Sequence, residues 1–250
     1  MFFIGIDLAW SPKNQTGIAV LEGDKKRASL KHVSCVQTDE EILAVVKQYA
    51  ALAPAFVAID APLIVSNKTG RRLAEALVAK QFAKYHAGAH PSNRTRFAAW
   101  GGPRGETVSK LLEKAGFSHK PNARKHELSN VFFEVYPHPA MIVLFGLQTV
   151  IPYKAKPKRD YLLRWNAFEH YQQHMKKLEH KKPSLHIGSF LDARVRNLKG
   201  KALKNYEDQL DGIFCAYLAY YAWQFPEKCV VLGNMKQGYI LTPALHNATV

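Results

Sequence analysis

Four aspartates in this sequence stand where a carboxylate is chemically unusual. Asp7 ends the apolar run Ile4-Gly5-Ile6, and Asp60 ends the similar run Val57-Ala58-Ile59. A carboxylate near the centre of a sheet costs on the order of several kcal/mol unless it is paired or bound to a metal. If the two runs are neighbouring parallel strands, both acids reach one edge of the sheet, and their repulsion requires a cation or a shared proton. The alternative is that each acid sits at a fraying strand end or in a turn.

The other two aspartates are close together near the C-terminus. Asp208 and Asp211 are spaced i, i+3, so on a helix they share one face, and Gly212 allows that face to pack closely on a sheet. The alternative is that Asn205 caps this helix and that both acids merely favour its dipole. Against it, Asp211 would lie beyond the first turn, where that benefit has mostly decayed.

The elements that must position these residues follow from hydrophobic periodicity. Three strands, expected at Phe2–Leu8, Thr16–Leu21 and Leu30–Val36, are joined by short polar turns and predict an antiparallel meander. A crossover helix from Asp39 leads to a buried strand at Phe56–Ile59. The later elements predicted are a helix at Gly70–Tyr85, a helix at Thr107–Ala115, a strand at Val131–Tyr136, a basic helical region between Arg159 and Lys182, a linker at Lys199–Asn205 and a long helix at Tyr206–Trp223.

This order predicts an α/β fold. We expect a mixed sheet, three antiparallel strands followed by two parallel strands, with helices on both faces and a helical insertion. A chain of 250 residues is within the range of one domain, so we expect residues 1–250 to form a single domain. The basic insertions are expected around 64–130 and 154–204.

The charge is unusual and unevenly distributed. The chain carries a net charge of +15, while residues 64–133 hold 13 basic and 4 acidic side chains, and residues 154–204 hold 14 and 4. Positive surface around a negative centre suits a polyanion such as nucleic acid, although such runs can also be plain solvated surface. The arginines expected to contact nucleic acid are Arg71, Arg72, Arg94, Arg96 and Arg104.

Composition indicates a soluble protein. No stretch approaches the roughly 18 apolar residues that a membrane span needs, and the three cysteines are far apart and suggest neither a disulfide framework nor a zinc site. We therefore expect a cytoplasmic protein without a membrane partner.

Four motifs together resemble a known family. GIDLAW, AIDAPL, EVYPHPA and YEDQLDGIFCAYLAY are similar to those of the predicted RNase H-like nucleases, domain of unknown function 429, in the ribonuclease-H-like superfamily. The resemblance implies a ribonuclease-H-like domain, with Asp7, Asp60, Asp208 and Asp211 as metal ligands and Glu134 as a fifth active-site acid. Holliday-junction resolvases, which share this arrangement of acids, usually carry Glu at the position of Asp60.

Clustered carboxylates suit Mg²⁺ or Mn²⁺, hard cations that prefer oxygen ligands. Two such ions about 4 Å apart can activate water and stabilise the leaving oxygen of a phosphodiester. Our hypothesis assigns Asp7 to both ions, Asp60 to one, and Asp208 and Asp211 to the other. From its own position, Glu134 reads either as an outer-shell ligand or as a strand-end acid that pairs with one of the nearby lysines.

The function expected is therefore metal-dependent hydrolysis of phosphodiester bonds in nucleic acid. One alternative is a non-catalytic nucleic-acid-binding protein of the same fold. Another is a phosphotransferase of the actin and sugar-kinase type, which also carries an aspartate on its first strand. That class normally has a glycine-containing phosphate turn after this aspartate, whereas Leu8-Ala9-Trp10 follows here.

Overall fold

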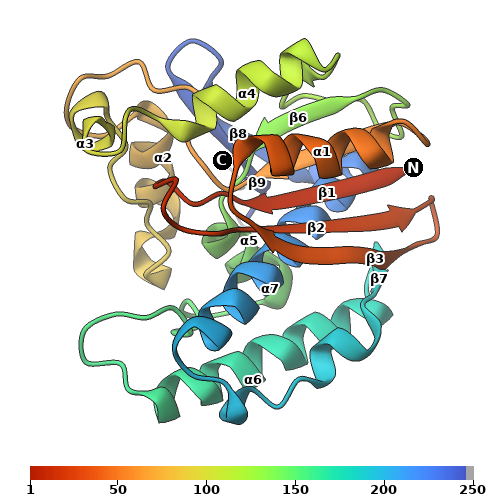
Figure 1. The fold of residues 1–250 in the computed structure, drawn as a ribbon, viewed down its shortest axis with the longest axis vertical. Helices are drawn as coiled ribbons and strands as arrows, with labels where there is room; N and C mark the ends of the chain where they lie inside the picture. The colour runs from red at the N-terminus through yellow and green to blue at the C-terminus, as the bar shows by residue number, and fades with distance from the viewer. Residues whose placement is uncertain (246–250) are drawn as a thin grey trace.

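The centre of the molecule is a seven-stranded mixed sheet with the strand order β5-β6-β4-β1-β2-β3-β7 (Figure 1). The structure is a computed structural model that describes residues 1–245. The strands of this sheet are β1 (Phe2–Asp7), β2 (Thr16–Gly23), β3 (Arg27–Val36), β4 (Ala55–Ile59), β5 (Ser118–His119), β6 (Val131–Glu134) and β7 (Ser184–His186). The short strands β5 and β7, at the two edges, were not predicted from the sequence.

The pairing confirms the predicted fold class. β1, β2 and β3 form the antiparallel meander, while β4 and β6 follow in parallel orientation beside β1. Asp7 lies opposite Gly17 of β2, and Ile6 lies opposite Ile59 of β4. This is the ribonuclease-H-like arrangement of a mixed sheet, and it brings the carboxyl ends of β1, β4 and β6 to one edge.

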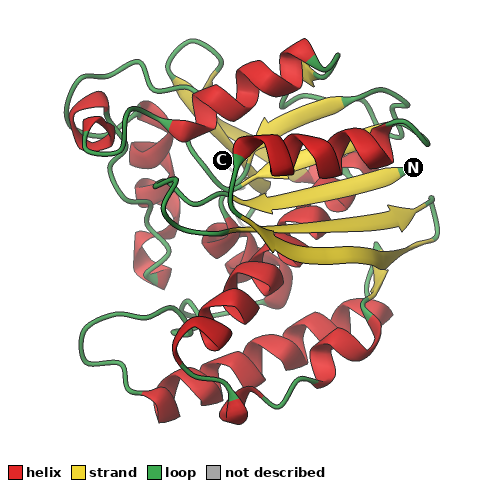
Figure 2. Ribbon diagram, viewed as in Figure 1, coloured by secondary structure: helices red, strands yellow, loops and turns green. Residues whose placement is uncertain are grey.

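Helices cover both faces of the sheet (Figures 1 and 2). They are α1 (Asp39–Ala50), α2 (Leu73–Phe82), α3 (Arg94–Ala98), α4 (Arg104–Lys114), α5 (Pro137–Phe145), α6 (Tyr161–Lys177) and α7 (Gly200–Gln224). A separate hairpin, β8 (Cys229–Asn234) and β9 (Gly238–Pro243), packs beside α2. None of the helices within residues 1–245 has the length and apolar character needed to cross a membrane.

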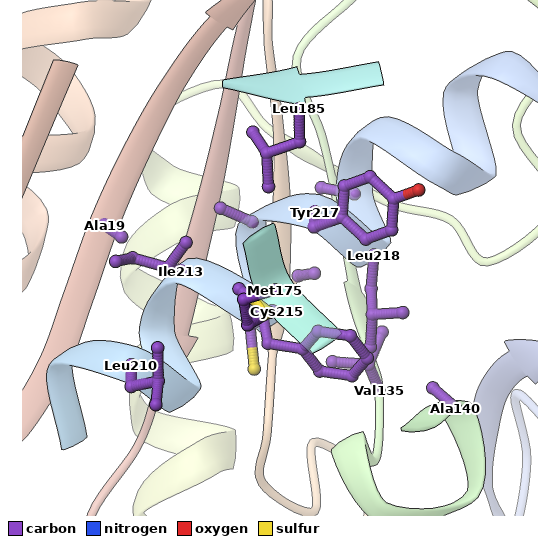
Figure 3. Close-up of a cluster of buried hydrophobic side chains, with 14 of the residues drawn as sticks. Ala19, Val135, Ala140, Met175, Leu185, Leu210, Ile213, Cys215, Tyr217 and Leu218 are labelled. Carbon is purple, nitrogen blue, oxygen red and sulfur yellow. The ribbon is translucent and has the colours of Figure 1, made fainter. Parts of the chain in front are cut away.

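Side chains of the strands alternate between two apolar clusters, as the period of two in a strand requires. Ile4 and Ile6 of β1 belong to the cluster that includes residues of α1 and α4. Phe3 and Phe56 point the other way, into the cluster that α5, α6 and α7 cover. Figure 3 shows part of this second cluster, where side chains of α7 meet those of β2, β7, α5 and α6.

The longest helix begins earlier than the sequence predicted. Residues 199–205 are not a linker, because α7 starts at Gly200 with Lys199 as its N-terminal capping residue. Asp208 and Asp211 therefore lie more than two turns inside the helix. At this depth the helix dipole contributes little, so the interpretation of these acids as dipole partners behind an Asn205 cap is wrong.

α7 lies directly on the backbone of β1 and β2, because glycines remove the side chains between them. A Cβ atom at Gly5 would overlap the backbone of Gly212 and Ala216, and one at Gly17 would overlap the backbone of Asp208. Since Gly17 is the register partner of Asp7, this close approach puts the acidic turn of α7 beside the end of β1.

We predict that Gly17→Ala lowers the free energy of unfolding by about 1–3 kcal/mol or more, because a methyl group would push α7 away from β2. Gly88→Ala is the matched control, since a Cβ there meets no atom within 4 Å. Urea denaturation of the two variants and the wild type measures the difference. Equal midpoints for both variants would show that this contact is not tight.

Candidate functional site

The four predicted aspartates come together at the carboxyl edge of the sheet. Asp7 is the last residue of β1, and Asp60 follows β4, where its N–H donates to the carbonyl of Ile6 at 2.8 Å. Asp208 and Asp211 reach the same place from α7. Acids separated by most of the chain are thus brought into one cluster, which we call the carboxylate cluster: Asp7, Asp60, Asp208 and Asp211.

Burial makes the carboxyl groups of Asp7 and Asp60 harder to ionise. Burial raises the pKa of Asp7 well above its ordinary value; the ammonium of Lys154 lowers it, and the charges of Asp211, Asp60 and Asp208 raise it. Burial likewise raises the pKa of Asp60 to about 7, against the opposing charge of Lys154. The folded chain therefore disfavours the state in which Asp7 and Asp60 are both charged, unless a further cation binds.

Asp211 is the most enclosed member, with no exposed surface. Its Oδ1 accepts hydrogen bonds from the hydroxyls of Tyr153 at 2.8 Å and Tyr171 at 3.3 Å. The Nζ atom of Lys154 lies 2.9 Å from Oδ2, yet Oδ2 has no partner of hydrogen-bonding geometry. The ammonium and Oδ2 are thus held together by charge, without the geometry of a hydrogen bond.

Asp208 has a different cation. Lys204, one turn earlier on α7, places its Nζ 2.6 Å from Oδ1 of Asp208 and 2.6 Å from Oε1 of Glu207. Glu207 also meets Arg164 at 3.3 Å. Burial raises the pKa of Asp208, while Lys204 opposes that rise.

A cleft of about 790 Å³ opens beside Asp7 and Asp60, and its walls are basic. Positive side chains from two separate segments line it: Arg71 from the segment before α2, and Lys154, Lys156 and Arg159 from the loop before α6. The cleft thus combines acids at the sheet edge with cations on its walls.

Three of these lysine and arginine residues were not singled out from the sequence. Lys154, Lys156 and Arg159 lie in the run Tyr153-Lys-Ala-Lys-Pro-Lys-Arg159, where only the basic composition was noted. The signal available was a dense positive run immediately before a capped helix. Nothing in the run itself indicates that Lys154 forms an ion pair with Asp211, while Lys156 only lines the cleft.

Histidines line the same cleft but carry little charge. His138 shares a 3.0 Å hydrogen bond with the hydroxyl of Tyr136, and burial lowers its pKa to about 3. Burial also lowers the pKa of His90. The neutral imidazole of His138 can donate one hydrogen bond and accept another, but it adds no positive charge near neutral pH.

Glu134 is part of a buried ion network. Its carboxylate accepts from the guanidinium of Arg72 at 2.6 and 3.0 Å and from the N–H of Leu63 at 2.9 Å. Arg72 also donates to Glu75 at 2.8 Å. The side chains of Arg72 and Glu134 are almost fully buried, so Arg72 has no surface for a phosphate, and its predicted role in nucleic-acid binding needs correction. Glu134 holds the chain after Asp60, and its oxygens already have partners.

Arg104 is a second arginine that was predicted to lie on the surface but is buried. Its guanidinium donates to Asp39 at 2.7 Å and to the carbonyls of Ala9 and Gln37 at 3.0 and 3.1 Å. These contacts tie α4 to the start of α1 and to the turn after β1. The expectation that Arg104 binds nucleic acid is corrected for the same reason as that for Arg72.

The remaining three arginines are exposed. Arg94 pairs with Glu106 at 2.8 Å, outside the carboxylate cluster. Arg96 lies over the ring of Trp10, 5.2 Å from its centroid, and Trp10 lines the cleft. Of the five predicted arginines, Arg71 is the one that itself lines the cleft.

The fit of a divalent metal can be judged from the donors. The four carboxyl groups supply the oxygen donors that Mg²⁺ or Mn²⁺ prefers, and Oδ2 of the buried Asp211 has no hydrogen-bond partner to give up. Among residues 1–245, however, no three acidic, His or Cys side chains are arranged around one point as metal ligands. The donor set fits, while in this conformation the cation among the carboxylates is the ammonium of Lys154.

We predict that Arg72→Met lowers the free energy of unfolding by about 3–5 kcal/mol, because it leaves Glu134 and Glu75 buried without their counter-ion. The neighbouring Arg71→Met should change it by less than about 0.5 kcal/mol, since Arg71 is exposed. Chemical denaturation of both variants separates these roles. Similar losses in the two would contradict the assignment of Arg72 to the interior.

We also predict that Asp60 contributes to the stability of the metal-free protein, and that this contribution declines as the pH rises from about 4 to about 7. In this range the unfolded chain has released the proton of Asp60 while the folded chain still binds it, because the folded pKa is about 7. Asp60→Asn should reduce the decline, which amounts to at most a few kcal/mol. Asp24→Asn should not, because hydrogen bonds from the backbone of Lys26 and Arg27 lower the pKa of Asp24 instead. Unfolding free energies measured across this pH range decide the point.

Comparison with known proteins identifies the family of this chain. No curated protein matches the chain. A family model does, over residues 5–235, and its description is a protein of unknown function, DUF429. The matched span runs from the residues just before Asp7 past both acids of α7. This chain therefore belongs to the DUF429 family, as the four sequence motifs predicted.

Proposed function

We propose that this protein hydrolyses phosphodiester bonds of nucleic acid with a divalent ion, Mg²⁺ or Mn²⁺, bound by the carboxylate cluster. One observation carries the proposal: Asp7 and Asp60 face a cleft with basic walls, with Asp208 and Asp211 grouped beside them. A phosphodiester is the substrate whose negative charge suits both parts of such a site. It is attracted by the basic walls and can be held against cations bound by the acids.

The basic walls suit phosphate groups. Arg71 lies in the first basic insertion, Lys156 and Arg159 lie in the second, and the three line one cleft. Contacts of this kind release counter-ions from nucleic acid, so they favour binding at low salt. A volume of about 790 Å³ is that of a small-ligand pocket, so the part of the substrate that enters is a short piece of strand.

The chain's own residues hold and orient the reacting groups. Asp7, Asp60, Asp208 and Asp211 are the residues that would bind the ion, and Tyr153 and Tyr171 fix the orientation of Asp211. The bound ion would supply Lewis acidity towards water and towards the leaving oxygen. Glu134 and Arg72 hold the segment that follows Asp60, so they act as positioning residues.

Two other functions remain as alternatives. A nucleic-acid-binding protein without turnover would use the same basic walls, and a phosphotransferase of the actin and sugar-kinase type would use the acids around a nucleotide. Hydrolysis is favoured because the four acids converge. A cytoplasmic location stays our prediction from the sequence.

A fluorescence-based cleavage assay tests the proposal. We predict that the wild type cleaves labelled single-stranded or duplex DNA or RNA only with Mg²⁺ or Mn²⁺. Asp7→Asn should lower the rate by more than about 100-fold, because it removes a central ligand. Asp24→Asn, far from the cleft lining, is the control and should keep the wild-type rate.

The other outcomes are informative as well. Cleavage that persists in Asp7→Asn, or in excess chelator, would contradict the proposal. Consumption of ATP without cleavage would favour the phosphotransferase, and tight, salt-sensitive binding with no turnover would favour the non-catalytic protein.

A further inference from the structure

We propose that Lys154 is an internal counter-ion that occupies the carboxylate cluster in the metal-free protein and leaves it when a divalent ion binds. The inference rests on the proposed function and adds how access to the site is controlled. Metal binding and the release of one lysine into the cleft would then be a single event.

The position of the Lys154 ammonium carries this inference. Its Nζ lies 2.9 Å from Oδ2 of Asp211, the buried oxygen that has no hydrogen-bond partner. The same charge lowers the pKa of both Asp7 and Asp60, so it acts on three members of the cluster at once. A cation in contact with one acid and close to two others occupies the region that a metal ion would need.

Lys154 is also placed so that it can leave. Its side chain is 28% exposed and lines the cleft, so rotation about its own bonds carries the ammonium into solvent. Such a rotation needs no movement of the backbone. The backbone at this point is fixed, because Nε of Arg164 donates a hydrogen bond to the carbonyl of the preceding Tyr153 at 2.9 Å. The four residues that follow, 155–158, are exposed.

Lys204 differs from Lys154 in this respect. It pairs with Asp208 and also with Glu207, an acid outside the carboxylate cluster. The ion pair with Glu207 would keep Lys204 in place when a metal ion binds. Within residues 1–245, Asp211 is the acid with which Lys154 forms an ion pair.

Charge balance explains why the exchange is favourable. One ammonium compensates a single charge among four carboxyl groups, and burial still raises the pKa of Asp7 and Asp60 despite it. A divalent ion brings twice the charge to the same acids, and it repels the ammonium. Once released, Nζ would join Lys156 and Arg159 on the cleft walls, where a phosphate binds.

Binding of Mn²⁺ to the wild type, Lys154→Met and Lys158→Met, measured by calorimetry and by electron paramagnetic resonance, tests this. Methionine keeps the length of the side chain and removes its charge. Lys154→Met should bind Mn²⁺ about ten-fold more tightly than the wild type, because the competing cation is gone. Lys158 lies on the same loop, exposed and outside the cleft lining, so Lys158→Met removes an equal charge and should bind Mn²⁺ as the wild type does.

A labelling experiment on the wild type does not depend on how the variants fold. Lys154 should react faster with an amine-acylating reagent when Mn²⁺ is added, as mass spectrometry would show. The reactivity of Lys156 serves as the internal reference.

The outcomes separate this inference from the function on which it rests. If the wild type binds Mn²⁺ while Lys154→Met binds it no more tightly, or if bound Mn²⁺ leaves the acylation of Lys154 unchanged, the exchange is wrong and the metal site stands. If none of the three proteins binds Mn²⁺ and none cleaves nucleic acid, the proposed function fails and the inference falls with it.

Discussion

Negative charge held where water scarcely reaches is the constraint on which this structure depends. Each acid at the sheet edge would prefer solvent, and together they repel one another. The fold answers with two tyrosine hydroxyls and an ammonium around Asp211, and with a second lysine on Asp208. These partners compensate the charge only in part: burial, together with the charges of Asp211 and Glu134, raises the pKa of Asp60 to about 7 against the opposing ammonium of Lys154. A cluster of acids with too few cations around it is suited to bind a further cation.

The packing of one helix creates that constraint. α7 can approach β1 and β2 only because Gly5 and Gly17 have no side chains, and the opposing Gly212 allows the same on the helix side. Any larger residue at these places would move the acids of α7 away from Asp7. The same contact that closes the apolar core therefore also sets the spacing of the charged groups at its edge.

The sequence was informative wherever a residue conflicted with its local pattern. An aspartate after a β-branched run is such a conflict, and it located Asp7 and Asp60 correctly at the ends of β1 and β4. Side-chain partners were not accessible in the same way, because they depend on distant segments. Arg72 lies in a basic stretch that is typical of a protein surface, yet it is buried in an ion pair with Glu134 of β6. Lys154 was one residue in a basic run, and only the tertiary fold turns it towards Asp211. The start of α7 was missed because Gly200 and the lysines around it read as a linker.

The closing of the sheet by α7 has a consequence for how the chain is made. β1 and β2 leave the ribosome well before α7, the helix that covers them. Until then Phe3 and Phe56 have no partner from α7, and the nascent chain displays an apolar sheet face of the kind that chaperones bind. The contacts between β1 and α7 are among the most distant in sequence, which predicts slow folding for a protein of this size. Production of this protein in a foreign host is thus expected to depend on the rate of synthesis and on chaperone supply.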